Sequence, residues 1–141
     1  MSIDFSNRTR TTVDRKLAVA TLDKLLAHYR LSGQHISVVV VGDRAMRTLN
    51  NRFRHKDRPT DVLSFASRDT AAVDPLDLGE LIIDWQQIIR QAPRFGQRPK
   101  RELVYILTHG FLHLLGYDDK SSAEAEAMKV LGEKLISRLK L

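Results

Sequence analysis

Two histidines and a pair of aspartates, close together near the C-terminal end of the chain, are the side chains best suited to chemistry. His109 and His113 are four residues apart, so on a helix both imidazoles lie on one face, within reach of a single metal ion. Gly116 can end that helix and let the chain turn back, which would bring Asp118 or Asp119 towards the same ion. Two histidines and one carboxylate leave coordination positions open, as in catalytic zinc sites.

Simpler explanations exist for each of these residues taken alone. Histidines on a buried helix can hydrogen-bond to neighbours, and aspartates can complement the positive N-terminal end of a following helix. The histidine pair, the glycine and the paired aspartates together favour a metal site. The zinc-protease pattern H-E-x-x-H has a glutamate beside its first histidine, but this chain has Gly110 there. Peptide hydrolysis by the standard route is therefore disfavoured, and a different base or a different substrate is needed.

A basic loop between a predicted helix and a predicted strand is the second informative segment. Arg54 lies in it, and its planar guanidinium can bind two oxygens of one phosphate. Thr60 and Asp61 are expected to shape the turn before the strand, and His55 to be solvated. Ser64 has no histidine partner that the sequence can assign, so a serine nucleophile is not expected.

The chain carries 23 lysines and arginines against 17 acidic residues, a net charge of +6. Residues 1–70 hold 13 basic and 7 acidic side chains, whereas residues 71–141 hold 10 of each. Basic side chains are concentrated within residues 44–58 and 90–101. Such clusters suit a polyanionic partner, because each neutralised phosphate releases counterions. The alternative is that these side chains only solvate the surface.

Length and composition indicate one folded domain over residues 1–141. Apolar residues make up 43% of the 141 residues, which is enough for a core. Cysteine is absent, so disulfides and cysteine-based zinc sites are excluded. No apolar run reaches the roughly 18 residues of a membrane span, and the first five residues lack a signal-peptide layout. We therefore expect a soluble cytoplasmic protein without a membrane partner.

Hydrophobic periodicity predicts four strands and five helices. The strands are expected at 3–5, 36–41, 62–65 and 78–84, with a loop at 67–77. The helices are expected from a Thr11 or Thr12 cap to Leu31 and Gly33, from 42 to a stop at Pro59, and at 85–92, 99–115 and 121–139. This order predicts an α+β fold, with a small mixed four-stranded sheet covered by helices. Helix 99–115 is apolar nearly all round, so it is expected to be buried and central, and to carry the metal site.

Three segments also resemble those of a known family. Residues 109–118 (HGFLHLLGYD) and 49–65 (a segment ending in PTDVLSF) are similar to the two most specific motifs of the YbeY family of bacterial ribosome-associated endoribonucleases. Residues 78–83 (LGELII) resemble a third motif, which usually has aspartate where this chain has Glu80. The similarity covers almost the whole chain in matching order.

The resemblance implies a metal held by three histidines, the second four and the third ten residues after the first. The first two fall on His109 and His113, but the third falls on Asp119. The family's conserved arginine falls on Arg54. A carboxylate binds zinc about as closely as an imidazole does, so we expect Asp119 to be a ligand. The site would be less positive by one charge, which makes manganese or another harder ion more competitive with zinc.

Three functions remain after this reasoning. The first, which the resemblance implies, is a metal-dependent endoribonuclease that cuts single-stranded RNA, matures the 3′ end of 16S rRNA and acts in ribosome quality control on the small subunit. In this reading Arg54 would be catalytic, and further basic residues would bind RNA: Arg52, Lys56, Arg58, Arg98 and Arg101. The second is a metallopeptidase, and the third is a non-catalytic ribosome- or RNA-binding factor with a structural metal. The sequence leaves the oligomeric state open.

Overall fold

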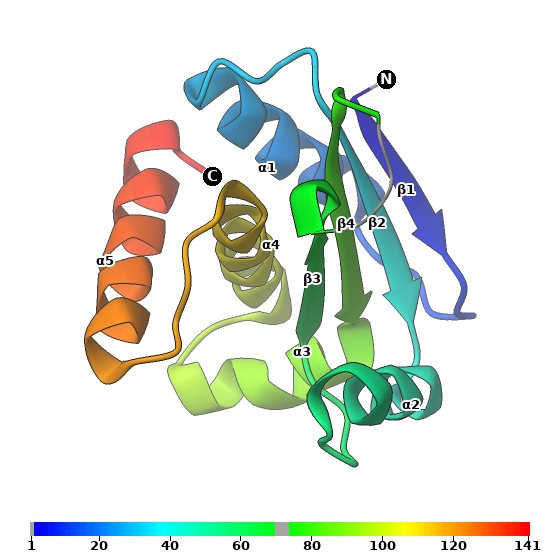
Figure 1. The fold of residues 1–141 in the computed structure, drawn as a ribbon. Helices are drawn as coiled ribbons and strands as arrows, with labels where there is room; N and C mark the ends of the chain where they lie inside the picture. Colours follow the sequence, from blue (N-terminus) through cyan, green and yellow to red (C-terminus); the bar gives the residue numbers. More distant parts are fainter. Residues whose placement is uncertain (1, 70–73) are drawn as a thin grey trace.

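The computed structural model describes residues 2–69 and 74–141, which form a four-stranded sheet packed against helices (Figure 1). The strands are β1 (Ile3–Asn7), β2 (His35–Val41), β3 (Val62–Ala66) and β4 (Asp77–Asp84). Their order across the sheet is β1-β2-β4-β3. β1, β2 and β4 run parallel, whereas β3 pairs antiparallel with β4. The predicted small mixed sheet in an α+β domain is confirmed.

The central strands are apolar on both faces because both faces are covered. Val38 and Val40 of β2 belong to the main core, whereas Val39 and Val41 belong to a smaller second cluster on the opposite face. Residues alternate between the two faces of a strand. The β-branched run that predicted an inner strand therefore serves two cores.

Two helices pack directly on one face of the sheet, a third lies outside them, and two more lie near the lower end of the sheet in Figure 1. α1 (Arg15–His28) and α4 (Pro99–Leu115) pack on the strands, and α5 (Ser122–Leu139) is the outer helix. α4 packs against β3 and β4, and has α1 and α5 as its helical neighbours. α2 (Asp43–Arg54) and α3 (Trp85–Gln91) directly follow β2 and β4, and a short 3-10 helix, η2 (Ala92–Phe95), continues α3.

The central position of α4 confirms the prediction made for it. Large apolar side chains on most of its sides are fully buried, among them Leu103, Leu107 and Phe111. Such burial is the main source of helix stability in a folded protein. Only a narrow side of α4 stays partly open to solvent, and both histidines lie on it.

The predicted ends of α1 were wrong at both termini. The N-cap is Asp14, whose carboxylate accepts a hydrogen bond from the Leu17 amide, rather than Thr11 or Thr12. At the other end the helix stops at His28, because Arg30 adopts a left-handed conformation and the Leu31 amide bonds back to the Leu26 carbonyl. This closing motif needs no glycine at Gly33.

The end of α2 also differs from the prediction. The helix ends at Arg54, because His55 takes a left-handed conformation with φ of 58°, well before Pro59. Buried Asn50 then donates a hydrogen bond to the Arg58 carbonyl, 2.8 Å away, and ties down the loop that follows. Arg54, which we expected in the basic loop, is thus the last residue of α2.

The loop predicted at 67–77 is described only in part. Residues 67–69 form a short 3-10 helix, η1 (Ser67–Asp69), β4 begins at Asp77, and residues 70–73 lie outside the described residues. None of the helices within the described ranges is both long enough and apolar enough to cross a membrane.

Candidate metal centre

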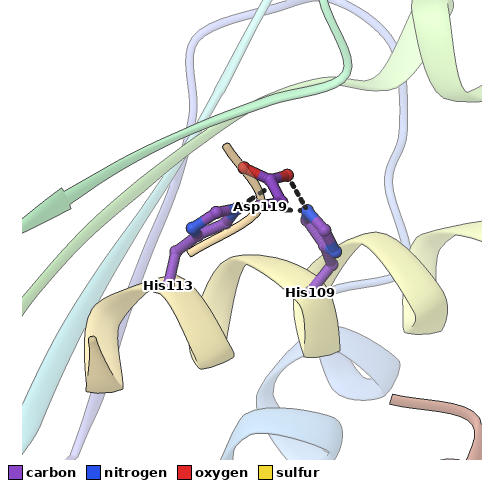
Figure 2. Close-up of side chains that lie close together, drawn as sticks. All are labelled: His109, His113 and Asp119. Carbon is purple, nitrogen blue, oxygen red and sulfur yellow. Dashed lines mark hydrogen bonds and ion pairs between the residues drawn. The ribbon is translucent and has the colours of Figure 1, made fainter. Parts of the chain in front are cut away.

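Helix α4 presents His109 and His113 on the same side, one turn apart, as their spacing predicts. Figure 2 shows both imidazoles projecting from the helix towards the carboxylate of Asp119. Their side chains are 25% and 18% exposed, against 40% for Asp119. The three residues form a group of potential metal ligands, as the sequence suggested.

The distances within this group fit one small cation. The Nε2 atoms of His109 and His113 are 3.1 Å apart, and each is 3.4 Å from Oδ2 of Asp119. Ligand bonds of about 2.0–2.1 Å in a tetrahedral site put neighbouring donor atoms about 3.3 Å apart. The donor set is therefore arranged as zinc or a similar divalent ion requires.

Gly116 brings Asp119 to the histidines by turning the chain at the end of α4. It adopts φ of 108°, a left-handed conformation that favours glycine, and its amide bonds to the His113 carbonyl. Of the two aspartates left open by the spacing, Asp119 faces the histidines. The Asp118 carboxylate instead accepts a hydrogen bond from the Asp119 amide and lies 3.5 Å from Lys120 Nζ.

Hydrogen bonding and burial prepare both imidazoles to bind a cation. Nδ1 of His113 lies 3.1 Å from the Tyr117 carbonyl, which can only accept, so Nδ1 carries the proton and Nε2 has a free lone pair. Burial, followed by the neighbouring His113, lowers the pKa of His109 below its usual 6.5. The hydrogen bond thus orients Nε2 of His113 as the ligating atom, and the lowered pKa of His109 favours its neutral form.

Arg68 holds the C-terminal end of α4 in place. Its guanidinium donates hydrogen bonds to the carbonyls of Leu114 and His113. These carbonyls are among the last four of the helix, which have no partner within it. A residue of η1, which follows β3, thereby fixes the helix end that carries His113.

Further side chains beside the metal group come from a different part of the chain. Arg54, Asp61 and Ser64 line a pocket of about 260 Å³ together with both histidines and Asp119. The pocket's remaining lining side chains are Val62, Tyr105 and Ile106. Arg54 therefore lies at the same pocket as the metal group, where a phosphate clamp would need to be.

Asp61 is held by a network that the sequence did not reveal. Gln91 Nε2, at the end of α3, donates to Asp61 Oδ2 at 2.8 Å and to Glu102 Oε2 at 2.9 Å. Gln97 donates to the other oxygen of Glu102, which is only 1% exposed. Burial raises the pKa of Glu102, and the Gln91 hydrogen bond opposes that rise. We expected Asp61 only to shape a turn, but its carboxylate also lines the pocket.

Close packing against the sheet explains why the residue after His109 is a glycine and not a glutamate. A Cβ atom at this position would lie 2.9 Å from Cδ2 of Leu81, which is fully buried, and 3.3 Å from Ser64 Oγ. α4 approaches the sheet too closely here for a larger residue. The general base of a zinc protease has no room at position 110.

The five arginines and lysines predicted to bind RNA do not line the metal pocket. Arg52, Lys56 and Arg58 are exposed at the end of α2 and in the loop after it, and the Arg52 guanidinium lies 5.4 Å from the centre of the Phe53 ring. Arg98 precedes α4. Arg101 lines a second hollow and donates a hydrogen bond to the Leu141 carbonyl.

Comparison with known proteins gives matches over nearly the whole chain. The family model described as Endoribonuclease YbeY matches residues 3–140. The Endoribonuclease YbeY of Chloroflexus aurantiacus is 38% identical over 138 residues, which cover 92% of this chain and 90% of that protein. That of Thermodesulfovibrio yellowstonii is 43% identical over 106 residues, covering 74% and 67%. The solution structure of a Thermotoga maritima protein superposes with a TM-score of 0.61 at 26% identity, covering 98% and 91%.

Proposed function

Because this chain belongs to the endoribonuclease YbeY family, we propose that it cleaves single-stranded RNA with a divalent metal ion held by His109, His113 and Asp119. The observation that carries this proposal is the meeting, in one pocket, of a cation-binding group and Arg54. The first comes from α4 and the turn after it, and the second from α2. Cleavage of a phosphodiester is favoured by both the cation and the arginine, because the negative charge on the phosphate grows as the reaction proceeds.

The donor set suits zinc, and the carboxylate of Asp119 also makes manganese a reasonable occupant. A divalent ion held there would supply positive charge and Lewis acidity to the scissile phosphate. The hydrogen bond from Nδ1 of His113 to the Tyr117 carbonyl would leave Nε2 of His113 as the ligating atom, and the lowered pKa of His109 would favour its neutral, ligating form.

Arg54 would bind the phosphate from the side opposite the histidines. It ends α2, and the loop after it is tied to that helix by Asn50. A guanidinium can donate two parallel hydrogen bonds to the non-bridging oxygens of one phosphate. Its positive charge would stabilise the transition state more than the ground state, because the negative charge on the phosphate grows as the reaction proceeds.

We propose that the natural substrate is the 16S rRNA precursor, cleaved near its 3′ end on the small ribosomal subunit in the cytoplasm, in the course of rRNA maturation and ribosome quality control. The family assignment and the basic character of residues 44–58 support this proposal. In a bacterium deleted for its own family member, the chain should restore mature 16S 3′ ends, and the Arg54→Ala variant should not.

Cleavage of a labelled RNA tests the activity directly. Protein stripped with a chelator and reloaded with zinc or manganese should cut a single strand and leave the matched duplex intact. Arg54→Ala should lower the cleavage rate by roughly 100-fold or more, with unchanged metal content. Arg10→Ala removes an exposed arginine in the loop between β1 and α1, outside the pocket, and should cleave at the wild-type rate.

Two results would overturn the proposal. Metal-loaded protein that binds RNA but never cuts it would be a non-catalytic binding factor. Cleavage that is equal in wild type and Arg54→Ala would show that the pocket is not where RNA is cut. Mass spectrometry of the intact holoprotein supplies the metal content for every variant.

A further inference from the structure

A second hollow lies beside the metal pocket and shares a wall with it. It has a volume of about 590 Å³ and lies between η2, the first half of α4 and the second half of α5. We call it the α4–α5 groove, and define it by Phe95, Arg101, Tyr105, Lys129, Glu133 and Ile136. A hollow of this size suits a small molecule or one unit of a polymer.

Tyr105 is the wall that the two hollows have in common. It lines both the metal pocket and the α4–α5 groove. Its ring is nearly parallel to that of His109, with an angle of 22° between the planes and 6.4 Å between the centroids. A chain bound at the metal group would therefore pass the tyrosine ring on entering the groove.

A hydrogen-bond network also connects the two hollows. Glu102, which lines the groove, accepts hydrogen bonds from Gln91 and Gln97. The same Gln91 amide donates to Asp61 in the metal pocket. The floor of the groove and the wall of the pocket are thus positioned by one set of side chains.

Phe95 presents an aromatic ring to solvent at the edge of the groove. It is 65% exposed, although it ends a well-defined short helix. Gly96 follows in a left-handed conformation with its amide bonded to the Pro93 carbonyl, so the backbone that holds Phe95 is fixed. An exposed ring on a rigid support can stack on a flat ligand at little entropic cost.

The charges that line the groove are balanced, which favours a neutral occupant over a phosphate. Arg101 and Lys129 are balanced by Glu102 and Glu133. The metal pocket, by contrast, would be positive with a divalent ion bound, because the ion and Arg54 together outweigh the carboxylates of Asp61 and Asp119. A balanced groove with aromatic rings suits a neutral, flat group with hydrogen-bonding edges, and a nucleobase has this character.

We propose that the α4–α5 groove binds one nucleobase of the single-stranded RNA, next to the nucleotide whose phosphate lies at the metal pocket, with Phe95 and Tyr105 as the stacking surfaces. The proposal rests on the proposed function, because it extends the same bound strand. It explains why the enzyme would act on single strands, since a paired base cannot enter the groove.

Binding of a short fluorescent RNA to chelator-treated protein tests this proposal without cleavage. Phe95→Ala should raise the dissociation constant roughly 5- to 100-fold, which is the range expected for the loss of one stacked base. Phe95→Tyr should restore nearly all of the affinity. Leu76→Ala is the matched control, because Leu76 is also exposed (51%) but lies in the turn just before β4 and lines neither hollow.

A set of RNAs, each with one abasic nucleotide, identifies the base concerned. At one position the abasic RNA should bind about as weakly as Phe95→Ala binds intact RNA, and combining both changes should cause no further loss. Additive losses at every position, or an unchanged affinity of Phe95→Ala, would overturn the proposal.

The same experiments separate this inference from the proposed function. Wild-type protein that cuts RNA while Phe95→Ala binds and cuts equally well refutes only the nucleobase site. Wild-type protein that neither binds nor cuts RNA refutes both.

Discussion

The two walls of the metal pocket are built in different ways. One wall, His109, His113 and Asp119, comes from a single stretch of eleven residues on α4 and the turn after it. The other wall, Arg54, Asp61 and Ser64, comes from the end of α2, the loop after it and β3. Helix geometry alone sets the spacing of the histidines, whereas the other wall depends on how the sheet, α3 and α4 pack. We therefore expect local substitutions to damage the first wall, and distant ones to damage the second.

The largest effect is expected from Asp119→Ala, in the wall formed by His109, His113 and Asp119. Removal of one of three ligands should weaken zinc affinity by roughly 100-fold or more, since even residues that only support a ligand contribute 10- to 100-fold. Asp118→Ala is the matched control, because its carboxylate faces the Asp119 amide and Lys120. Competition with a chromophoric chelator measures both variants. Equal affinities in wild type and Asp119→Ala would remove Asp119 from the ligand set.

The buried carboxyl group of Asp84 supports the other wall, formed by Arg54, Asp61 and Ser64. Its substitution should change the free energy of unfolding in a pH-dependent way. Asp84 is fully buried, its carboxylate caps α3, and its amide bonds to the Asp61 carbonyl. Burial, followed by the neighbouring Asp43, raises the pKa of Asp84 to about 7. Between about pH 4 and pH 7, the Asp84 carboxyl therefore keeps its proton in the folded protein and loses it in the unfolded chain, where its pKa is 3.8.

The sign of the effect follows from that difference. The stabilising contribution of the Asp84 proton is complete below about pH 4 and is lost as the pH rises to about 7. Asp84→Asn keeps the oxygen that caps α3 and needs no proton. We expect it to be about 2 kcal/mol more stable than wild type at pH 8, with a smaller difference at pH 4. Urea unfolding at both pH values measures this, and a variant less stable at pH 8 would contradict it.

The smallest effect concerns the contact between the two walls. Gly110→Ala should destabilise the fold by about 1 kcal/mol, because overpacking against Leu81 and Ser64 exceeds the gain in helix propensity. It should also slow RNA cleavage, since Ser64 lines the pocket. Gly132→Ala in α5 is the matched control, because the nearest atom to the new Cβ would be 4.0 Å away. That variant should gain about 0.5–1 kcal/mol, and equal free energies of unfolding for the two variants would contradict the packing argument.

The sequence predicted element types well and element ends less well. Every predicted strand and helix is present in the expected order, because each has a clear hydrophobic period or an apolar run of suitable length. The ends of α1 and α2 were wrong because Arg30 and His55 take left-handed conformations usually occupied by glycine. The hydrophobic pattern does not contain the local bonds that accompany these turns, such as those from the Leu31 amide to the Leu26 carbonyl and from Asn50 to the Arg58 carbonyl.

The candidate site shows the same division. The spacing of His109 and His113 and the break at Gly116 were sufficient to predict one wall, although not to choose between Asp118 and Asp119. Arg54 was chosen for its chemistry and by resemblance, and the fold places it at the pocket. Asp61 and Tyr105 were missed, since an aspartate before a strand and a tyrosine on an apolar helix have ordinary structural roles. Nothing in the sequence shows that Gln91 connects Asp61 to Glu102.

The sequence by itself determined the donor set, the buried helix that carries it and the absence of any thiol ligand, because these depend on residue type and on spacing within one segment. Only the tertiary structure decided that Asp119 faces the histidines, that Arg54 lines the same pocket and that the α4–α5 groove lies next to it. The placing of Arg54 beside His109, and of Arg68 at the Leu114 carbonyl, joins residues 40 or more positions apart. Contacts of that kind form only when the packing of α4 on β3 and β4 brings distant segments together.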